Sequence, residues 1–408
     1  MAAGSGAAEP DTPTAAPPEA PGQSPDDVPA PPPHGAGSAP PPLAGPGKDT
    51  SGKGGPRRTV LAAAGLALLL VIAGVVFVAF GGYDLLAGRP ETGATAADGS
   101  AAPAAAVPIP TIAGSVPVGA TPGFVAVSPN GRLAYVANRN AGVVTVVDTA
   151  VNKVTATIPI SAGPPQYLAF SPDGRRVYVS VFDDRRTVAA VAVLDTGSNS
   201  EIATVPVRTR PYALAVTPDG SRIYVPNHDS GTVSVIDAKT NEVTAEIEVA
   251  PNPHWIAFSK DGSRAYTANH ESNLVSVLDT RTNTVLAQVP VGQSPHSVAV
   301  NPARPLVANV NYDAGTVSMI DVNTRAVVAT VPVGRNPQAI AWSPDGRFAY
   351  TANVGDGTVS VISADGYAVT ATIPTGQEPT SVAVLPNGRQ AYVSNLKSGT
   401  LTVLDLAG

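Results

Sequence analysis

The stretch SPDGRFAYTANVGDGTVSVIS, Ser343 to Ser363, contains a turn, a strand, a polar break and a second strand. Its Asp345-Gly346 pair separates the apolar run QAIAWS from the apolar run RFAYTAN. Such a pair favours a tight hairpin turn, because the turn needs a positive φ that glycine adopts without strain. After GTVSVIS, the turn ADG leads into a fourth run, AVTATIPTG. The region therefore predicts four consecutive antiparallel strands.

This pattern recurs from about residue 112 to the end of the sequence. From Gly220 onward the turn glycines are 42 or twice 42 residues apart, and the missing turn falls at Arg304, in NPARPLVAN. Seven copies are present, and four strands in roughly 40 to 45 residues is the length of one β-propeller blade. The sequence thus predicts an all-β, seven-bladed β-propeller of four-stranded antiparallel blades. The turns SPNG, SPDG, TPDG, SKDG, SPDG and LPNG end at Gly131, Gly174, Gly220, Gly262, Gly346 and Gly388.

The first and last copies predict how the ring closes. The last copy stops at TLTVLDLAG, before its fourth strand, while TIAGSVPVG, Thr111 to Gly119, precedes the first copy and is similar to fourth strands elsewhere. An unpaired strand edge is a site of aggregation, so closure is favoured. We expect the N-terminal strand to complete the seventh blade.

The second strands carry a family resemblance. The runs AYVAN, VYVSV, IYVPN, AYTAN, AYTAN and AYVSN are each followed by a strand like GTVSVID, and together they resemble the repeats of the YVTN family of β-propellers. The resemblance covers residues 112 to 408, and it implies the propeller fold more strongly than any function. Blade two departs from the pattern at Val181, and blade five departs at Ala308 and Asn309.

The region before the repeats predicts three further segments. Residues 1–56 are rich in Pro, Ala and Gly, which predicts a disordered cytoplasmic tail. Residues 57–82 include an uncharged run, 60–80, that is long enough to cross a bilayer as a helix. Arg57 and Arg58 before this run predict a cytoplasmic N-terminus and an extracytoplasmic propeller at the cell membrane. Residues 83–110 then read as a flexible linker, and residues 111–408 as the propeller.

Composition disfavours several classes of function. The net charge is −6 and the basic residues are scattered, so nucleic acid is a poor candidate partner. The absence of cysteine excludes disulfides, thiolate metal sites and a cysteine nucleophile. No nucleophile elbow, P-loop, dinucleotide fingerprint or paired-carboxylate motif is present, so no catalytic or cofactor-binding residue is predicted.

Histidine is concentrated in one part of the ring. Four of the five histidines fall in blades three to five, either where a first strand begins or in the loop between strands two and three. Both positions lie at one mouth of the expected channel. Neutral imidazoles could ligate a metal or act in acid–base chemistry, but no HxH or HExxH spacing is present, and no metal site is predicted. The predicted ligand-binding residues are His228, His254, Trp255, His270, His296 and Tyr312.

The asparagine that ends most second strands and the aspartate that ends most third strands have a structural interpretation. Both residue types form local hydrogen bonds at strand ends and turns, and six copies around a ring cannot form one active site. The sequence therefore favours a membrane-anchored module that recognises a protein, polymer or small ligand without a cofactor. Two alternatives remain open. The first is a lactonase-like hydrolase, or a metal- or cofactor-dependent enzyme, that uses the histidines, and the second is a cell-envelope scaffold.

Overall fold

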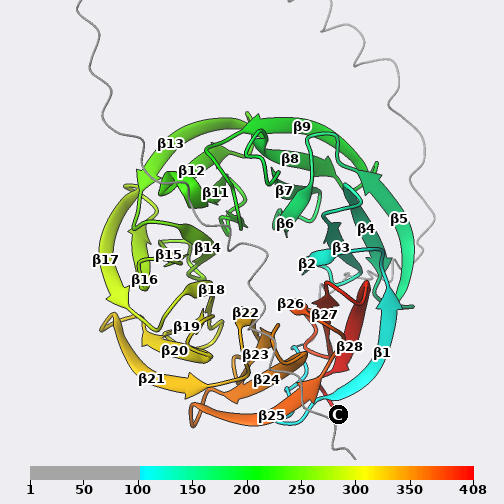
Figure 1. Ribbon diagram of the computed structural model, residues 1–408, viewed down its shortest axis with the longest axis vertical. Coiled ribbons are helices and arrows are strands. Elements are labelled where there is room, and N and C mark those ends of the chain that lie inside the picture. Colours follow the sequence, from blue (N-terminus) through cyan, green and yellow to red (C-terminus); the bar gives the residue numbers. More distant parts are fainter. Residues whose placement is uncertain (1–101) are drawn as a thin grey trace, which may run out of the picture. The chain divides into compact units, whose positions relative to one another are not determined.

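Seven four-stranded antiparallel sheets are arranged in a ring in the computed structural model, which describes residues 102–408 (Figure 1). Each sheet is one blade, and its first strand lies innermost. The predicted all-β propeller with seven blades is therefore confirmed. The predicted tail, the predicted membrane helix and the linker up to residue 101 lie outside the described residues. Within residues 102–408, no helix is both long and apolar enough to span a membrane.

The first three blades follow one another along the chain. Blade 1 contains β2 (Pro122–Val127), β3 (Leu133–Asn138), β4 (Val143–Asp148) and β5 (Lys153–Pro159). Blade 2 contains β6 (Pro165–Phe170), β7 (Arg176–Phe182), β8 (Ala189–Asp195) and β9 (Ser200–Pro206). Blade 3 contains β10 (Ala215–Val216), β11 (Arg222–Asn227), the short 3-10 helix η1 (His228–Ser230), β12 (Thr232–Asp237) and β13 (Glu242–Glu248).

The remaining blades have the same plan. Blade 4 contains β14 (Pro253–Phe258), β15 (Arg264–Asn269), β16 (Leu274–Asp279) and β17 (Thr284–Pro290). Blade 5 contains β18 (Pro295–Val300), β19 (Leu306–Asn311), β20 (Thr316–Asp321) and β21 (Ala326–Pro332). Blade 6 contains β22 (Pro337–Trp342), β23 (Phe348–Asn353), β24 (Thr358–Ser363) and β25 (Ala368–Pro374). Blade 7 contains β26 (Pro379–Val384), β27 (Gln390–Asn395), β28 (Thr400–Asp405) and β1 (Thr111–Pro117).

The order of blade 7 confirms the expected closure. Strand β1, from the start of the described chain, pairs antiparallel with β28 at its end, so the two ends of the chain share one sheet (Figure 1). Val116 of β1 is buried in the core between blades 7 and 1. The described end of the expected linker, residues 102–110, also packs on the ring, where Ala106 is buried and donates its N–H to Asp345 Oδ2 at 2.9 Å.

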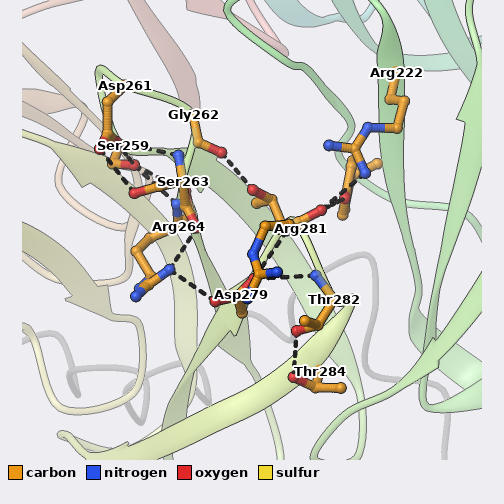
Figure 2. A network of polar contacts seen from close by, with 12 residues as sticks. Arg222, Ser259, Asp261, Gly262, Ser263, Arg264, Asp279, Arg281, Thr282 and Thr284 are labelled. Atoms are coloured by element: carbon orange, nitrogen blue, oxygen red, sulfur yellow. Dashed lines mark hydrogen bonds and ion pairs between the residues drawn. The ribbon is translucent and has the colours of Figure 1, made fainter.

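The two ends of the ring differ in chemistry. At the lower face, defined by the turns between strands one and two and between strands three and four, aspartates hold tight turns. Figure 2 shows blade 4, where Asp279 Oδ1 accepts the N–H groups of Arg281 (2.9 Å) and Thr282 (3.1 Å). Hydrogen bonds from Ser259 and Ser263 lower the pKa of Asp261 to about 2. These aspartates are structural, as the sequence predicted.

The asparagine at the end of each YVTN-like strand is also structural. Asn353 is buried, and its Nδ2 donates to Thr358 Oγ1 (3.0 Å) and Ser360 Oγ (2.9 Å) of the neighbouring third strand. The same bonds join Asn311 to Thr316 and Ser318. The asparagine side chain therefore joins the second and third strands of its blade. It lies at the end of the ring where the histidines also lie.

Candidate functional site

The upper face, defined as the end opposite the aspartate turns, gathers the predicted histidines. His254 and His296 follow the first residues of β14 and β18, whereas His270 follows the last residue of β15. In five of the seven blades the first residue of the inner strand pairs with the last residue of the second strand, as Pro253 does with Asn269. The repeat therefore brings both kinds of position to the same end of the ring.

Four imidazole rings, from His228, His254, His270 and His296, form a cluster on this face, which we call the imidazole cluster. The ring centroids of His254 and His296 are 4.5 Å apart, and those of His270 and His296 are 4.6 Å apart. His228 lies 5.9 Å from both His254 and His270. Side chains from three blades therefore share one site.

Tyrosines extend the cluster on both sides. Tyr212 lies over His254, with centroids 3.6 Å apart, and Tyr312 is stacked on His296 at 4.3 Å. Phe182 is 5.8 Å from Tyr212. The five rings form a continuous row from blade 2 to blade 5, and aromatic and imidazole faces of this kind stack well on planar ligand groups.

Backbone hydrogen bonds fix the loop histidines. The N–H of His228 donates to Arg210 O at 2.9 Å, and the N–H of His270 donates to Asn252 O at 2.8 Å. Arg210 and Asn252 both have positive φ, at 58° and 59°. The aligned residues Thr121, Ser294, Asn336 and Glu378 have the same positive φ, so this conformation is a feature of the repeat. Each loop histidine is thus held by the residue that leads into the inner strand of its own blade.

Arg210 is a site residue that the sequence analysis missed. Its aligned positions in the next two blades hold Asn252 and Ser294, residues that are small and polar. A large charged side chain at this repeat position was the signal that could have identified it. The Arg210 guanidinium Nη1 lies 3.6 Å from Asp229 Oδ1.

Asp229 is the charged group next to the imidazole cluster. It accepts a hydrogen bond from His228 Nδ1 at 2.9 Å, and Arg186 Nε lies 2.9 Å from its other oxygen. Burial raises the pKa of Asp229, but the hydrogen bond from His228 and the charges of His228, Arg210 and Arg186 outweigh this and hold it below its usual value. Asp229 is therefore a carboxylate at neutral pH, and it accepts a hydrogen bond from the N–H group at His228 Nδ1.

His254 lies at the centre of the row and has a defined tautomer. Its Nδ1 is 2.9 Å from the backbone oxygen of His296, and because a carbonyl only accepts, Nδ1 carries the proton. The lone pair of the neutral ring is then on Nε2. Burial, followed by the charges of His228, His270 and Arg210, holds the pKa of His254 well below its ordinary value. His254 is a neutral imidazole at neutral pH.

The depth of the cluster differs from the sequence expectation. The predicted positions, at strand starts and in loops at a channel mouth, are usually open to water, but His228, His254 and His296 are only 5%, 1% and 1% exposed. They pack against one another and against the tyrosines, which removes them from water. Only His270 is half-buried. Substituting all four would therefore cost far more stability than substituting surface loop residues.

Trp255 points to a different part of the ring from the histidines. Its ring contacts Tyr167 (4.8 Å) and Phe124 (5.6 Å), and these two are stacked at 3.7 Å. The three residues come from β14, β6 and β2, and blades 1 and 4 are not neighbours in the ring (Figure 1). The contact between Phe124 and Trp255 therefore crosses the centre of the propeller. We call these three rings the aromatic floor.

The upper face outside the cluster carries paired charges. Arg139 pairs with Asp184, Arg335 with Asp356 (2.6 Å) and Lys397 with Glu378 (3.4 Å). These pairs are exposed and contribute little stability. Among residues 102–408, no group of three or more His, Cys, Asp or Glu side chains has an arrangement that could hold a metal ion.

Comparisons with known proteins agree on the architecture. The family model described as "Lactonase, 7-bladed beta-propeller" matches residues 143–250 and 237–333, and the model described as "WD domain, G-beta repeat" matches residues 334–363. The chain is a seven-bladed β-propeller. The lactonase-type match covers all four histidines of the imidazole cluster.

Two individual proteins show how far this likeness extends. A seven-bladed beta-propeller protein of Mycobacterium tuberculosis is 33% identical over 128 residues, which is 30% of this chain and 30% of that protein. The matched region thus spans less than a third of the curated relative. Hydrazine synthase of Kuenenia stuttgartiensis has a chain with a TM-score of 0.64 and 22% identity, and the match covers 70% of this propeller chain and 96% of the other. At that identity the likeness shows the fold alone.

Proposed function

We propose that this propeller is a recognition module that binds a ligand on its upper face, at the imidazole cluster and the two tyrosines beside it. The observation that carries the proposal is the row of contacting rings from Tyr212 through His254 and His296 to Tyr312. Fold stability does not require histidine here, because the aligned positions in other blades hold other residue types. Tyr212 and His270 are the half-buried members of this group, and they present a π-face and an imidazole at one mouth of the ring, where propellers commonly bind.

The charge on this face favours a ligand without a large net charge. Asp229 pairs with both Arg186 and Arg210, which leaves a single positive charge in excess, and the ion pairs farther out are balanced. His254 is neutral at neutral pH because of its burial and its charged neighbours. A planar or cyclic ligand that accepts or donates a few hydrogen bonds matches these groups.

We also propose that residues 60–80 anchor the propeller in the cell membrane, with the N-terminus cytoplasmic and the ring outside. The support is the uncharged run itself, with Arg57 and Arg58 before it. Protease added to intact cells or spheroplasts should then digest the propeller and spare a tag at residue 1. A protected propeller and a digested tag would contradict this orientation.

Hydrolysis of a cyclic ester is the second candidate function. It is favoured by the lactonase-type match over the cluster and by the neutral form of His254, whose Nε2 carries the lone pair that a general base uses. In such a reaction the imidazole would take a proton from water and the water oxygen would bond to the carbonyl carbon. The ring C–O bond would then break as the imidazolium returns the proton to the leaving alcohol oxygen. Arg210 lies beside the cluster and could stabilise the developing negative charge.

One experiment separates the two candidates. The full-length protein is screened by thermal shift against a panel of small ring compounds that includes neutral lactones, and each hit is tested for binding and for turnover. His270→Ala should weaken binding of a hit at least tenfold, since His270 is the half-buried member of the cluster. Leu396→Ala, at the aligned position of blade 7, is the control and should bind normally.

The outcomes of this screen are distinct. Binding without product formation supports recognition, whereas turnover that is lost in His254→Gln supports the hydrolase. Hits that bind equally well to wild type and His270→Ala would contradict both assignments to this face. A protein that binds insoluble envelope material and no soluble compound would favour a scaffold.

A further inference from the structure

A cavity of about 680 Å³ lies on the lower face, at the junction between blade 7 and blade 1. Its wall includes side chains or backbone of Asp148, Thr149, Gln390 and Asp405. The volume is in the range of small-molecule and peptide pockets, roughly 300 to 1,000 Å³. Because the cavity is on the face opposite the imidazole cluster, it is separate from the proposed function.

The repeat shows what occupies the same place at other junctions. At three of the other six junctions, an arginine near the start of a second strand reaches across to the next blade and donates to a backbone carbonyl in the turn after the third strand. Figure 2 shows the guanidinium of Arg222, from blade 3, donating to a backbone carbonyl of blade 4. These bonds join Arg176 to Ala238 O (2.8 Å), Arg222 to Thr280 O (2.8 Å) and Arg304 to Ala364 O (3.0 Å).

The junction between blades 7 and 1 lacks this arginine. Gln390 stands where Arg176 and Arg222 stand in their blades, two residues before the tyrosine of the second strand. The aligned carbonyl is that of Thr149, which directly follows the aspartate at the end of β4. In the described part of the chain, no donor reaches this carbonyl oxygen, and Gln390 makes no side-chain hydrogen bond. The cavity thus contains the acceptor without the guanidinium that bonds it at three other junctions.

Carboxylates beside the cavity complete a cation-binding geometry. Asp148 and Asp405 each use one oxygen, Oδ1, to accept a backbone N–H in their turns, at 2.8 Å and 3.1 Å. Their second oxygens have no partner within residues 102–408. Arg132 and Arg389 also line the cavity, and both are exposed, so the wall carries two arginines beside the two carboxylates. At the junction of blades 5 and 6, Arg304 uses the same combination, since it bonds a carbonyl and also pairs with a carboxylate.

We propose that this cavity binds a guanidinium group carried by an arginine of a partner peptide. A guanidinium is planar and presents five N–H donors, so it can bond the Thr149 carbonyl and a neighbouring carboxylate together. A lysine ammonium does not match this planar pattern. The cavity is larger than one side chain, so it accommodates residues on either side of the arginine.

Calorimetry on the full-length protein tests the ligand class. The probe is a blocked Gly-Arg-Gly tripeptide, and the control is the same tripeptide with citrulline, which has the shape of arginine without its charge. The arginine peptide should bind at least tenfold more tightly. No binding of the arginine peptide, or equal binding of both peptides, would overturn the proposal. Agmatine binding as tightly as the peptide would overturn the assignment to a peptide.

Gln390→Arg tests the location. It supplies the missing side chain from within the chain, so it should abolish binding of the arginine peptide and raise the melting temperature through the new bond to Thr149. Retained binding would show that the peptide binds elsewhere.

A second pair of variants keeps the test decisive if Gln390→Arg does not fold. Asp405→Asn preserves the Oδ1 acceptor of the turn but removes the charge, and it should weaken binding at least tenfold. The matched control is Asp237→Asn in blade 3, where the junction is already filled by Arg176. Unchanged binding in Asp405→Asn would overturn the site.

Discussion

At the scale of single residues, repeated positions have taken on different roles in different blades. The tyrosine of the second strand is an example. Tyr224 donates to Asn283 Oδ1 at 2.6 Å, and Tyr135 donates to Asn199 Oδ1 at 2.7 Å, in each case across a blade junction. The asparagine that accepts the bond has a positive φ, which its residue type tolerates. One side chain thus joins two blades.

Substituting this tyrosine by phenylalanine should change the free energy of unfolding differently at two aligned positions. Tyr224→Phe removes the hydrogen bond to Asn283 and should lower the free energy of unfolding by about 1 kcal/mol. Tyr350 is equally buried, but its hydroxyl has no partner within residues 102–408, because the chain ends meet where the next turn would lie. Tyr350→Phe should be neutral or stabilising. Urea unfolding of both variants checks this, and an equal loss in both would refute the explanation.

His254 should make the protein sensitive to acid. In the unfolded chain its imidazole binds a proton as the pH falls through about 6.5. In the folded protein burial lowers its pKa well below that value, so the unfolded state binds more protons. The free energy of unfolding therefore falls as the pH drops below about 6.5, by at most about 1.4 kcal/mol per pH unit for one proton. Above that pH, His254 contributes no slope.

The comparison of wild type with His254→Gln isolates this effect. Urea unfolding is measured between pH 8 and pH 5 for both proteins. The variant should lose roughly 1 kcal/mol per pH unit of the acid slope, whatever its absolute stability. Identical slopes would mean that His254 is not the residue responsible.

At the scale of strands, two departures from the repeat occur as matched pairs. Blade 2 has Val181 in place of the buried asparagine, and Ala190 and Ala192 stand where other blades carry the hydroxyls that bond it. Blade 5 has Ala308 in place of the tyrosine, and the turn of blade 6 has Tyr367 in place of the accepting asparagine. A buried polar group without its partner is costly, which explains why both partners are absent in these two cases.

The closing strand β1 offers a matched pair of substitutions. Val116 is 4% exposed and packs between blades 7 and 1, whereas Ile112 on the same strand is 51% exposed. Val116→Asp buries an unpaired carboxylate and should lower the free energy of unfolding by several kcal/mol. Ile112→Asp should cost under about 0.5 kcal/mol. Thermal melts measure both variants, and an equal loss of stability in the two would show that β1 does not close the ring.

At the scale of the whole molecule, the sequence predicted how the blades and the histidines are arranged, but it did not predict how deeply the histidines are buried. The 42-residue spacing of turn glycines was enough for the number of blades, and the spare strand was enough for ring closure. Repeat positions also placed the histidines at one end of the ring. They could not show that His254 and His296 are buried against each other, because depth depends on side chains from neighbouring blades. The contribution of Arg210 was missed for the same reason.

The central claim is that the imidazole cluster is the binding surface. The chain has five histidines and two tryptophans, so selective isotope labelling of these residue types gives NMR spectra with few signals. A ligand from the small-ring screen should shift the signals of His254, His270 and His296 and leave His34 and Trp342 unchanged. Ligand binding that shifts Trp342 and none of the cluster histidines would contradict the account.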